Sequence, residues 1–457
     1  MAKHFAVVGG GWAGFAAAVE LSRSGHQVTV FESARTLGGR ARRVSYDGRE
    51  LDNGQHIMLG AYSESLRIMR AVGVDLKSAV LTLPLQMRYP PGGGMDFVAP
   101  RLPAPLHVGV ALLRARGLER VDKMALARFT TTARWMDWRL NNDCSVAELL
   151  ERFDQTPRLV ALMWRPLCLA ALNTPPERAS ANVFLAVLRD SLGARRAASD
   201  MLVPRADLSA LFPDAAAAWL QGKGNTVHVG AKVTALHPAA GGWSVSASGA
   251  ALNGNWSGNF DGVVLATPAT ASAALLSALQ EAVAEDPTGE PAGFLELARQ
   301  LAAFEPEPIT TCYLQYAPGT RLEIPFYALL DDPASQRWGQ FVFDRGQLDA
   351  RQDGLFAVVI SASSDAASLP QDALTAAIGT QLAADLKRPE LAAPSWSKVI
   401  TEKRATYACT PGLKRPANET PAKSLVLAGD YTAGEYPATL EMAVRSGVQA
   451  AQVLAKA

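Results

Sequence analysis

The sequence predicts an α/β protein in which a Rossmann-like dinucleotide-binding domain carries an inserted α+β domain. Three observations support this fold class. Residues 5–32 follow the pattern strand, glycine loop, helix, strand and acid, and a second apolar strand ending in Gly-Asp occurs near the C-terminus. At 457 residues the chain is also too long for one ordinary core, so we expect two or three domains.

The first strand and its glycine loop suit a bound pyrophosphate. Gly9, Gly11 and Gly14 form G-x-G-x-x-G directly after the apolar strand 5–8. The first glycine allows a tight turn, the second lets a pyrophosphate approach the backbone, and the third lets the helix pack closely on the strand. The free N–H groups and positive dipole end at the helix start favour the anion.

The rest of this unit argues against a secretory signal or a membrane anchor. A helix over 15–24 and a strand over 27–31 follow the glycines, and Glu32 ends the strand. Glu20 and Arg23 interrupt the apolar stretch well before the ~20 residues that a membrane span needs. Glu32 lies near the distance of ~20 residues at which a carboxylate accepts hydrogen bonds from a ribose. We therefore predict a dinucleotide cradle in the mature chain.

Composition narrows the class of protein further. The chain has 44 Lys and Arg against 43 Asp and Glu, so no overall charge favours nucleic acid. Its four cysteines are scattered with no C-x-x-C pair, which indicates reduced thiols and a cytoplasmic location. The histidines are isolated and no metal-ligand spacing occurs, so we expect no metal site.

Two polar turns after Glu32 favour FAD over NAD as the dinucleotide. Gly39 and Arg40 follow a close-approach turn, where Arg40 would neutralise a pyrophosphate or lie over the flavin edge. The turn 51–56, which ends on His56, would suit a loop near the isoalloxazine ring. A solvated surface turn and a capping histidine are the alternatives at these two sites.

The C-terminal region supplies a third argument for FAD. The strand 424–430 ends in Gly429 and Asp430, and Asp430 would hydrogen-bond a ribityl hydroxyl. The N-terminus of the following helix, 438–455, would face the flavin pyrimidine, where negative charge accumulates on reduction. An NAD-dependent dehydrogenase does not need a second cofactor-binding segment near the C-terminus, whereas FAD is long enough to touch both ends of the chain.

The middle of the chain completes the predicted domains. Residues 225–236 are expected to form a strand in which Val233 makes a backbone contact with adenine, and 261–268 a buried strand ended by proline. The predicted FAD-binding domain therefore consists of residues 1–60, 200–274 and 400–457. Residues 61–199 and 275–399 are left for a domain that binds substrate and contacts a membrane.

These segments resemble the flavin-dependent amine oxidase and carotenoid desaturase superfamily over nearly the whole chain. The resemblance is carried by GGGWAG, ESARTLGGRARR, DGVVLATP and LAGDYTAGEYPATLEMAVRSG. It implies an FAD-binding domain of the amine-oxidase type. Within the superfamily, LDNGQHIMLGAYSESLRIMRAVG and GDYTAGEYPATLEMAVRSG resemble the hydroxysqualene dehydroxylases, the squalene-associated FAD enzymes of bacterial hopanoid pathways.

The resemblance assigns FAD contacts and indicates that FAD is held noncovalently. Monoamine oxidases often carry a cysteine after the C-terminal Gly-Asp that bonds the flavin, and residues 431–442 contain none. This difference also weakens the amine oxidase interpretation. The expected cofactor-binding residues are Gly9, Gly11, Gly14, Glu32, Gly39, Arg40, Val233, Gly429, Asp430 and Met442.

The inserted segments are expected to receive an apolar substrate. Residues 105–116, 118–140 and 157–172 look helical and amphipathic, with arginine interleaved among Leu, Met and Trp. Such helices suit either a solvated arginine face over a core or a peripheral contact with the anionic inner face of the cell membrane. Strands at 310–315, 326–330, 340–343 and 355–361 suggest a sheet with one packed face below the substrate tunnel.

The implied reaction is reductive removal of the allylic hydroxyl of hydroxysqualene to give squalene, for hopanoid or triterpenoid biosynthesis. The hydroxyl is a poor leaving group, so a proton donor is required, and the electron donor that reduces FAD is not identified by the sequence. His56, Asp137, Asp143 and Tyr431 are the candidate donors. The alternatives are a phytoene-type isoprenoid desaturase, an amine oxidase and a lipid carrier without catalysis.

Overall fold

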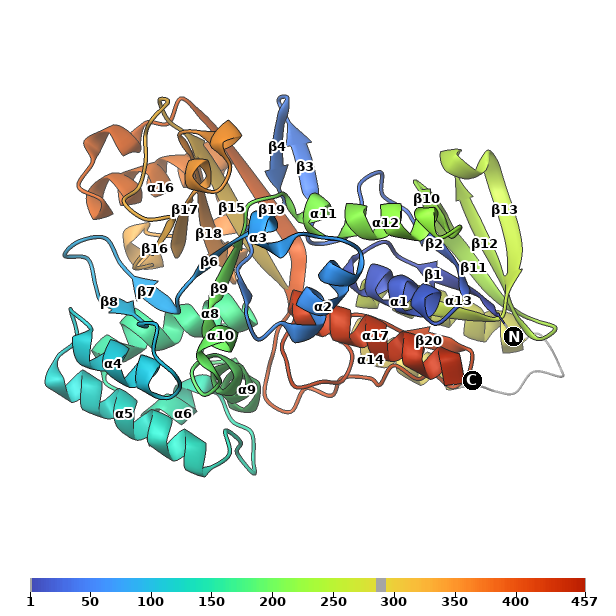
Figure 1. Cartoon of the computed structure of the whole chain (residues 1–457), viewed down its shortest axis with the longest axis horizontal. Helices are drawn as coiled ribbons and strands as arrows, with labels where there is room; N and C mark the ends of the chain where they lie inside the picture. The colour runs from blue at the N-terminus through green and yellow to red at the C-terminus, as the bar shows by residue number, and fades with distance from the viewer. Residues whose placement is uncertain (1, 285–292, 457) are drawn as a thin grey trace.

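A five-stranded parallel sheet forms the centre of one lobe in the computed structural model, which describes residues 2–284 and 293–456 (Figure 1). All five strands come from the three segments predicted to form the dinucleotide-binding domain. In spatial order they are β10 (Thr226–Val229), β2 (Gln27–Glu32), β1 (His4–Val8), β14 (Gly262–Leu265) and β20 (Leu425–Leu427). Because the strands are parallel, their carboxyl ends lie along one edge, where α/β proteins bind ligands.

Both faces of this sheet are buried. Val7 and Val30 pack against one layer of helices, α1 (Trp12–Arg23), α12 (Pro213–Gly222) and α17 (Leu440–Lys456). Their neighbours Ala6 and Phe31 point the other way, into a core shared with an antiparallel sheet. That sheet consists of β11 (Lys232–Ala239), β12 (Gly242–Gly249) and β13 (Gly254–Phe260), and α13 (Ala269–Ala284) lies beside it. This arrangement explains why the strands read as continuous apolar runs.

Helices α1 and α17 bring the two ends of the chain together. A Cβ on Gly447 of α17 would lie only 2.1 Å from the carbonyl oxygen of Ala13 in α1, so the glycine permits a very close approach of the two backbones. Figure 1 shows the two helices side by side under the parallel sheet. The glycine loop before α1 and the Gly-Asp loop before α17 therefore meet at the same edge.

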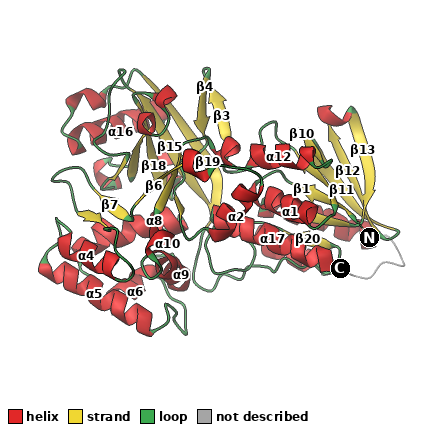
Figure 2. Ribbon diagram, in the orientation of Figure 1, coloured by secondary structure: helices red, strands yellow, loops and turns green. Residues whose placement is uncertain are grey.

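A second five-stranded sheet lies at the other end of the molecule (Figure 2). Its strand order is β16 (Phe326–Ala328), β17 (Phe341–Asp344), β18 (Leu355–Ser361), β15 (Pro306–Gln315) and β19 (Trp396–Tyr407). The prediction of one packed face was wrong, because β17 and β18 are buried at every residue. Cys312 and Leu314 pack with helix α16 (Gln371–Asp385), whereas Tyr313 between them points into the core shared with the first lobe.

Helices and short strands fill the remaining part of the second lobe. Ser145, Thr156 and Ser180 start three of the helices, and each hydroxyl accepts the N–H three residues on. The helices are α4 (Leu106–Arg114), α5 (Arg120–Trp135), α6 (Val146–Arg152), α7 (Pro157–Leu159), α8 (Arg165–Leu172), α9 (Ala181–Ser191) and α10 (Arg196–Ser199), with a π-helical turn at Val160–Trp164. The strands are β5 (Met58–Leu59), β6 (Val80–Leu83) and β9 (Met201–Pro204) in one sheet, and β7 (Gln86–Arg88) and β8 (Asp96–Val98) in another.

The structure corrects one predicted strand. Residues 225–236 form two strands in different sheets, because Gly230 has a φ of +72° and turns the chain between them. The remaining elements are the hairpin β3 (Arg43–Tyr46) and β4 (Arg49–Asp52), and helices α2 (Ser63–Ala71), α3 (Leu76–Ala79), α11 (Leu208–Leu211), α14 (Phe294–Ala302) and α15 (Ser364–Ala367).

The predicted domain boundaries do not all coincide with element ends. The boundary at residue 274 falls inside α13. Helix α2 was assigned to the inserted domain, yet the N–H groups of Glu64 and Ser65 donate to the buried Glu441 carboxylate of α17 at 3.1 and 2.9 Å. Glu441 thus links α2 to α17, which belongs to the helix layer that covers the parallel sheet.

Candidate active site

The glycine loop between β1 and α1 leaves open space beside one of its three glycines. A Cβ on Gly9 would lie 2.5 Å from the Ala266 carbonyl oxygen, and one on Gly14 only 1.9 Å from the Gly9 carbonyl oxygen. Packing within the chain therefore excludes side chains at these two positions. The nearest atom to a Cβ on Gly11 would be the Cα of Gly39, at 3.9 Å. The protein itself leaves room there, and this fits a ligand that approaches the backbone at the start of α1.

Glu32 is fixed beside this loop by backbone donors. Its Oε2 accepts the Gly10 N–H and its Oε1 accepts the Ala34 N–H, both at 2.7 Å. The residue is buried, and Oε2 keeps a lone pair for a ribose hydroxyl, whereas Oε1 also accepts the Ser33 hydroxyl at 3.3 Å. The Ala231 N–H donates to the Glu32 carbonyl at 2.8 Å, which brings the buried Val233 of β11 to the same end of β2.

Arg40 joins the N-terminal and C-terminal parts of the site. Its guanidinium donates to Asp430 Oδ1 at 2.6 Å and to the Ala405 carbonyl at 3.0 Å. Asp430 is buried, whereas 32% of the Arg40 side chain is exposed. Gly39 precedes it with a φ of +62° and packs against Gly11, since a Cβ on Gly39 would lie 3.3 Å from the Gly11 Cα. The arginine turn and the glycine loop thus border the same space.

The loop that carries Asp430 is held by hydroxyl groups beneath it. Ser446 Oγ of α17 accepts the Gly429 N–H at 2.9 Å and the Thr432 hydroxyl at 2.7 Å. The Tyr431 ring folds back over Gly429, where a Cβ would lie 2.4 Å from a ring carbon, so only glycine fits. The Tyr431 hydroxyl lies 3.2 Å from Ser272 Oγ, and burial raises the pKa of Tyr431, which keeps the phenol protonated at neutral pH.

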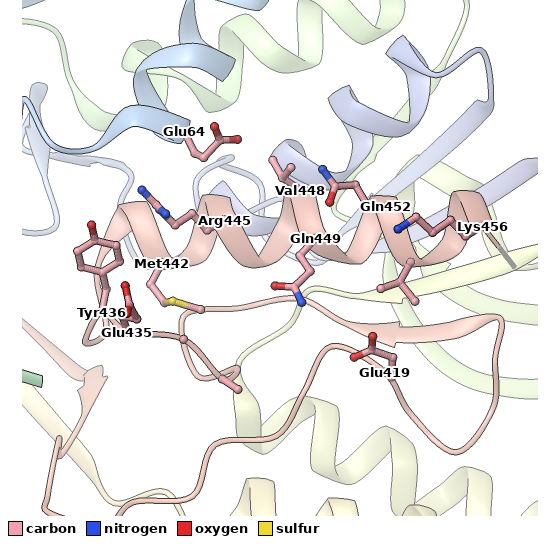
Figure 3. A pocket seen from close by; sticks show the side chains of 13 residues that line it. Glu64, Glu419, Glu435, Tyr436, Met442, Arg445, Val448, Gln449, Gln452 and Lys456 are labelled. Carbon is pink, nitrogen blue, oxygen red and sulfur yellow. The ribbon is translucent and has the colours of Figure 1, made fainter. Parts of the chain in front are cut away.

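Met442 differs from the other predicted cofactor contacts in the direction of its side chain. It lines a hollow of about 610 Å³ along the outer face of α17, together with Tyr436, Arg445 and Gln449 (Figure 3). Its N–H donates to the Thr439 hydroxyl at 3.2 Å. None of the glycine loop, Arg40 or Asp430 lines this hollow, so it is a feature of the surface rather than the space that the other predicted residues border.

The turn 52–56 lies directly against the turn 39–42, which carries Arg40. Asn53 donates its amide to the Arg40 carbonyl at 2.7 Å and accepts the Arg42 N–H at 3.0 Å. His56 follows, with Nδ1 3.1 Å from the Gly54 carbonyl oxygen. Burial lowers the pKa of His56, so the imidazole is neutral at neutral pH. These contacts place the turn beside Arg40, and its predicted position near the isoalloxazine ring stays a prediction.

A buried polar network behind this turn was missed by the sequence analysis. Tyr313 of β15 donates its hydroxyl to the Asp52 carbonyl and accepts the Gln55 amide, both at 2.8 Å. The Arg345 guanidinium donates to Gln55 Oε1 at 2.8 Å and lies 3.9 Å from the Asp52 carboxylate. Burial raises the pKa of Asp52 to about 6 although Arg345 opposes this shift. Asp52 stands in the quoted turn, but no sequence signal links it to positions 313 and 345.

Two of the four candidate proton donors lie apart from this cluster. Asp137 is exposed and follows α5, which lies in the helical lobe (Figure 1). Asp143 accepts the Ser180 hydroxyl at 2.7 Å and the Asn182 N–H at 3.0 Å, as a structural cap for α9. His56 and Tyr431 are the candidates that belong to segments bordering Arg40 and Asp430. Among residues 2–284 and 293–456, no group of His, Cys, Asp and Glu could hold a metal ion.

The site therefore defines a dinucleotide-binding oxidoreductase whose cofactor is long enough to reach both ends of the chain. The chain belongs to the flavin containing amine oxidoreductase family, whose sequence pattern matches residues 12–455. It is an enzyme, and its cofactor is FAD. Three features fit that cofactor. The room beside Gly11 and the partly exposed Arg40 side chain suit its pyrophosphate, and the hydrogen-bonded Glu32 carboxylate suits a ribose.

Comparisons with individual proteins agree with this family. The chain is 29% identical to a hydroxysqualene dehydroxylase of Rhodopseudomonas palustris, over 99% of both chains. It is 36% identical to a zeta-carotene desaturase of Zea mays, but over only 26% of this chain and 21% of the desaturase. The crystal structure of an oxidoreductase from Methanosarcina mazei superposes with a TM-score of 0.70 at 16% identity, covering 98% of this chain and 99% of that one.

Proposed function

We propose that this flavoenzyme reductively removes the allylic hydroxyl of hydroxysqualene and releases squalene. The observation that carries the proposal is the extent of similarity. The likeness to a hydroxysqualene dehydroxylase runs through both inserted segments, where substrate is expected to bind, and covers 99% of each chain. The likeness to carotenoid desaturases covers less of this chain, 26% for the Zea mays desaturase and 50% for a probable zeta-carotene desaturase of Synechococcus elongatus, although the local identity to the former is higher.

The reaction breaks one C–O bond and forms one C–H bond. The allylic carbon receives a hydride, which carries two electrons, and the departing hydroxyl receives one proton and leaves as water. FAD in its reduced form supplies the hydride when bound. A reductant of the nicotinamide or one-electron-carrier class must then restore the reduced cofactor for the next turnover.

The residues of the chain have two tasks in this scheme. One is to donate a proton to the leaving hydroxyl, for which the neutral phenol of Tyr431 and the imidazole of His56 are the candidates beside the cofactor segments. The other is to exclude water around the developing allylic charge, which aromatic faces stabilise. Tyr313, Phe326, Phe341 and Phe343 point from the second sheet into the same apolar core as Tyr431 and suit this task.

An anaerobic single-turnover experiment tests the proposal. The purified holoenzyme is reduced chemically, mixed with hydroxysqualene, and the extract is analysed for squalene. We expect about one squalene per flavin with reduced enzyme, and none with oxidised enzyme or with protein stripped of FAD. Absence of squalene, together with aerobic desaturation of a polyene such as phytoene, would instead establish the isoprenoid desaturase alternative.

A further inference from the structure

The exposed apolar side chains of the protein gather on one pair of helices. Among the described residues, six large apolar side chains are strongly exposed, and five of them lie on α4 and α5. The sixth, Leu295, lies on α14 in the other lobe. The five are Leu106 at 56% exposure, Leu113 at 74%, Val121 at 56%, Met124 at 66% and Trp135 at 87%. Single exposed apolar residues need no explanation, but five on two adjacent helices do.

On each helix the exposed apolar side chains share one face, with Arg128 and Thr131 lying between Met124 and Trp135 on α5. On α5, Val121, Met124 and Trp135 are spaced by three and eleven residues, so at 100° per residue they lie within about 60° of one another around the helix. Leu126, Phe129 and Ala133 occupy the other side and are buried in the lobe. The Lys123 ammonium donates to the Leu113 carbonyl at 2.9 Å, which links the end of α4 to the start of α5.

The charges around the five side chains are mostly positive. Residues 101–139 contain eight Lys and Arg and three Asp and Glu, a net charge of +5 in a chain whose overall charge is +1. Of the three acids, Asp122 is buried and Glu119 pairs with Arg158 at 3.1 Å. Within the described part of the chain, no ion pair engages the exposed arginines of this region, which are Arg101, Arg114, Arg116, Arg120, Arg128, Arg134 and Arg139.

We propose that the α4–α5 surface, formed by the five apolar side chains and the surrounding arginines, docks on an anionic lipid bilayer. An amphipathic helix with an apolar stripe and a cationic border lies in the headgroup region with its apolar face inserted. Trp135, the most exposed of the five, has the amphipathic ring that prefers this interface. None of the described helices is long and apolar enough to cross a bilayer.

Figure 1 supports the geometry of such docking. Helices α4 and α5 form the outer edge of the helical lobe, far from both termini and from the parallel sheet of the FAD-binding lobe. Docking here would leave that lobe free in solution and would hold the lobe that carries the inserted segments against the lipid. The proposal does not depend on which apolar substrate the enzyme uses, because its test measures binding rather than turnover.

The test is cosedimentation of the full-length holoenzyme with lipid vesicles. We expect binding to vesicles that contain phosphatidylglycerol, weak binding to pure phosphatidylcholine, and release as the salt concentration rises. The substitutions Val121→Ser, Met124→Ser and Trp135→Ser combined should abolish binding. Arg128→Gln with Arg134→Gln should weaken binding to anionic vesicles about 25-fold, at about fivefold for each cation near the surface.

Two matched controls lie elsewhere on the protein. Leu295→Ser removes the sixth of the strongly exposed apolar side chains, and Arg351→Gln removes an arginine that is 85% exposed, pairs with Asp349 and lies in a 3-10 turn between β17 and β18. Both should bind vesicles like the unmodified enzyme, and all variants should keep their FAD and melting temperature. Equal binding by the triple variant, or no binding to anionic vesicles, would overturn the proposal. A dimer in lipid-free solution that the triple variant dissociates would also overturn it, because a second copy would then cover the surface.

Discussion

The Arg40 guanidinium lies 2.6 Å from the Asp430 carboxylate, so residues 390 positions apart share one ion pair at the edge of the parallel sheet. Arg40 follows the glycine loop that starts the chain, and Asp430 follows the last strand. The pair therefore closes the two ends of the chain around the space that Gly11 leaves open. A single ligand bound there touches both ends, which is what FAD requires.

Arg40→Met should weaken both the fold and the retention of FAD. The substitution leaves Asp430 buried without its cation, which should lower the free energy of unfolding by about 3 kcal/mol. This is the lower end of the cost of breaking a buried ion pair, because part of Arg40 is exposed. The measurements are urea unfolding and the ratio of flavin to protein absorbance. Arg43→Met is the matched control, since Arg43 is 33% exposed and its partners Glu50, Asp207 and Asp214 are partly exposed carboxylates rather than a buried one. We expect a cost of about 1 kcal/mol or less and full flavin content for Arg43→Met, and equal behaviour of the two variants would contradict the role given to the pair.

The three glycines of the loop should respond differently to alanine. Gly11→Ala adds a methyl group whose nearest protein atom is the Gly39 Cα at 3.9 Å, so the free energy of unfolding of the apoprotein should stay within about 1 kcal/mol of that of the unmodified chain. The methyl group fills the open space, so FAD titration followed by flavin fluorescence should show binding weakened at least tenfold. Gly14→Ala would instead bring its Cβ to 1.9 Å from the Gly9 carbonyl oxygen and should destabilise the apoprotein itself.

A control for alanine substitution is available in α12. A Cβ on Gly222 would meet no atom within 4 Å, so Gly222→Ala should keep FAD and gain up to about 1 kcal/mol from helix propensity. If Gly11→Ala binds FAD as tightly as Gly222→Ala, the space beside Gly11 is not where the cofactor approaches the backbone.

The sequence identified the parts of the site that depend on local order along the chain. The strand, glycine loop, helix and acid of residues 4–32 follow the predicted order, since hydrophobic periodicity and glycine spacing are local signals. The Gly-Asp loop was found for the same reason. The strand 225–236 was misjudged because its β-rich composition continues through Gly230, and only the positive φ there separates the two strands.

Contacts between distant side chains could not be predicted from one sequence. The Asp52, Tyr313 and Arg345 network joins three segments whose spacing carries no motif. The second sheet shows a related limit. Its alternating aromatic residues suggested one packed face, but Tyr313 and Leu314 enter two different cores because α16 covers the face that was expected to be free. Burial of both faces depends on tertiary packing rather than on the strands themselves.

Asp52 should make stability fall as pH rises. Folding raises the Asp52 pKa from 3.8 to about 6, so the folded state binds this proton more tightly than the unfolded state. The resulting stabilisation is fully present below about pH 4 and is lost as pH rises through about 6, and it amounts to about 3 kcal/mol. Asp52→Asn cannot ionise, so its stability relative to the unmodified enzyme should improve by about this amount between pH 4 and pH 7. Urea unfolding of both proteins over this range measures the difference, and a constant difference would refute the raised pKa.

The proton donor can be identified from the pH dependence of squalene formation, provided that the proposed reaction is observed. We expect Tyr431 to be the donor, because burial keeps its phenol protonated and its hydroxyl has Ser272 Oγ as a neighbour at 3.2 Å. Tyr431→Phe should then lower the single-turnover rate of the reduced enzyme about 100-fold or more, while FAD stays bound. His56→Gln should leave the rate within a few-fold of the unmodified enzyme.

The pH profile separates the two donors without relying on either variant. A Tyr431 donor predicts a rate that is flat across neutral pH, since the raised pKa keeps the phenol protonated throughout. A His56 donor predicts a rate that falls as pH rises through a value below 6.5, because burial lowers the pKa of that imidazole and its charged form is the acid. A falling profile that His56→Gln removes would therefore transfer the role from Tyr431 to His56.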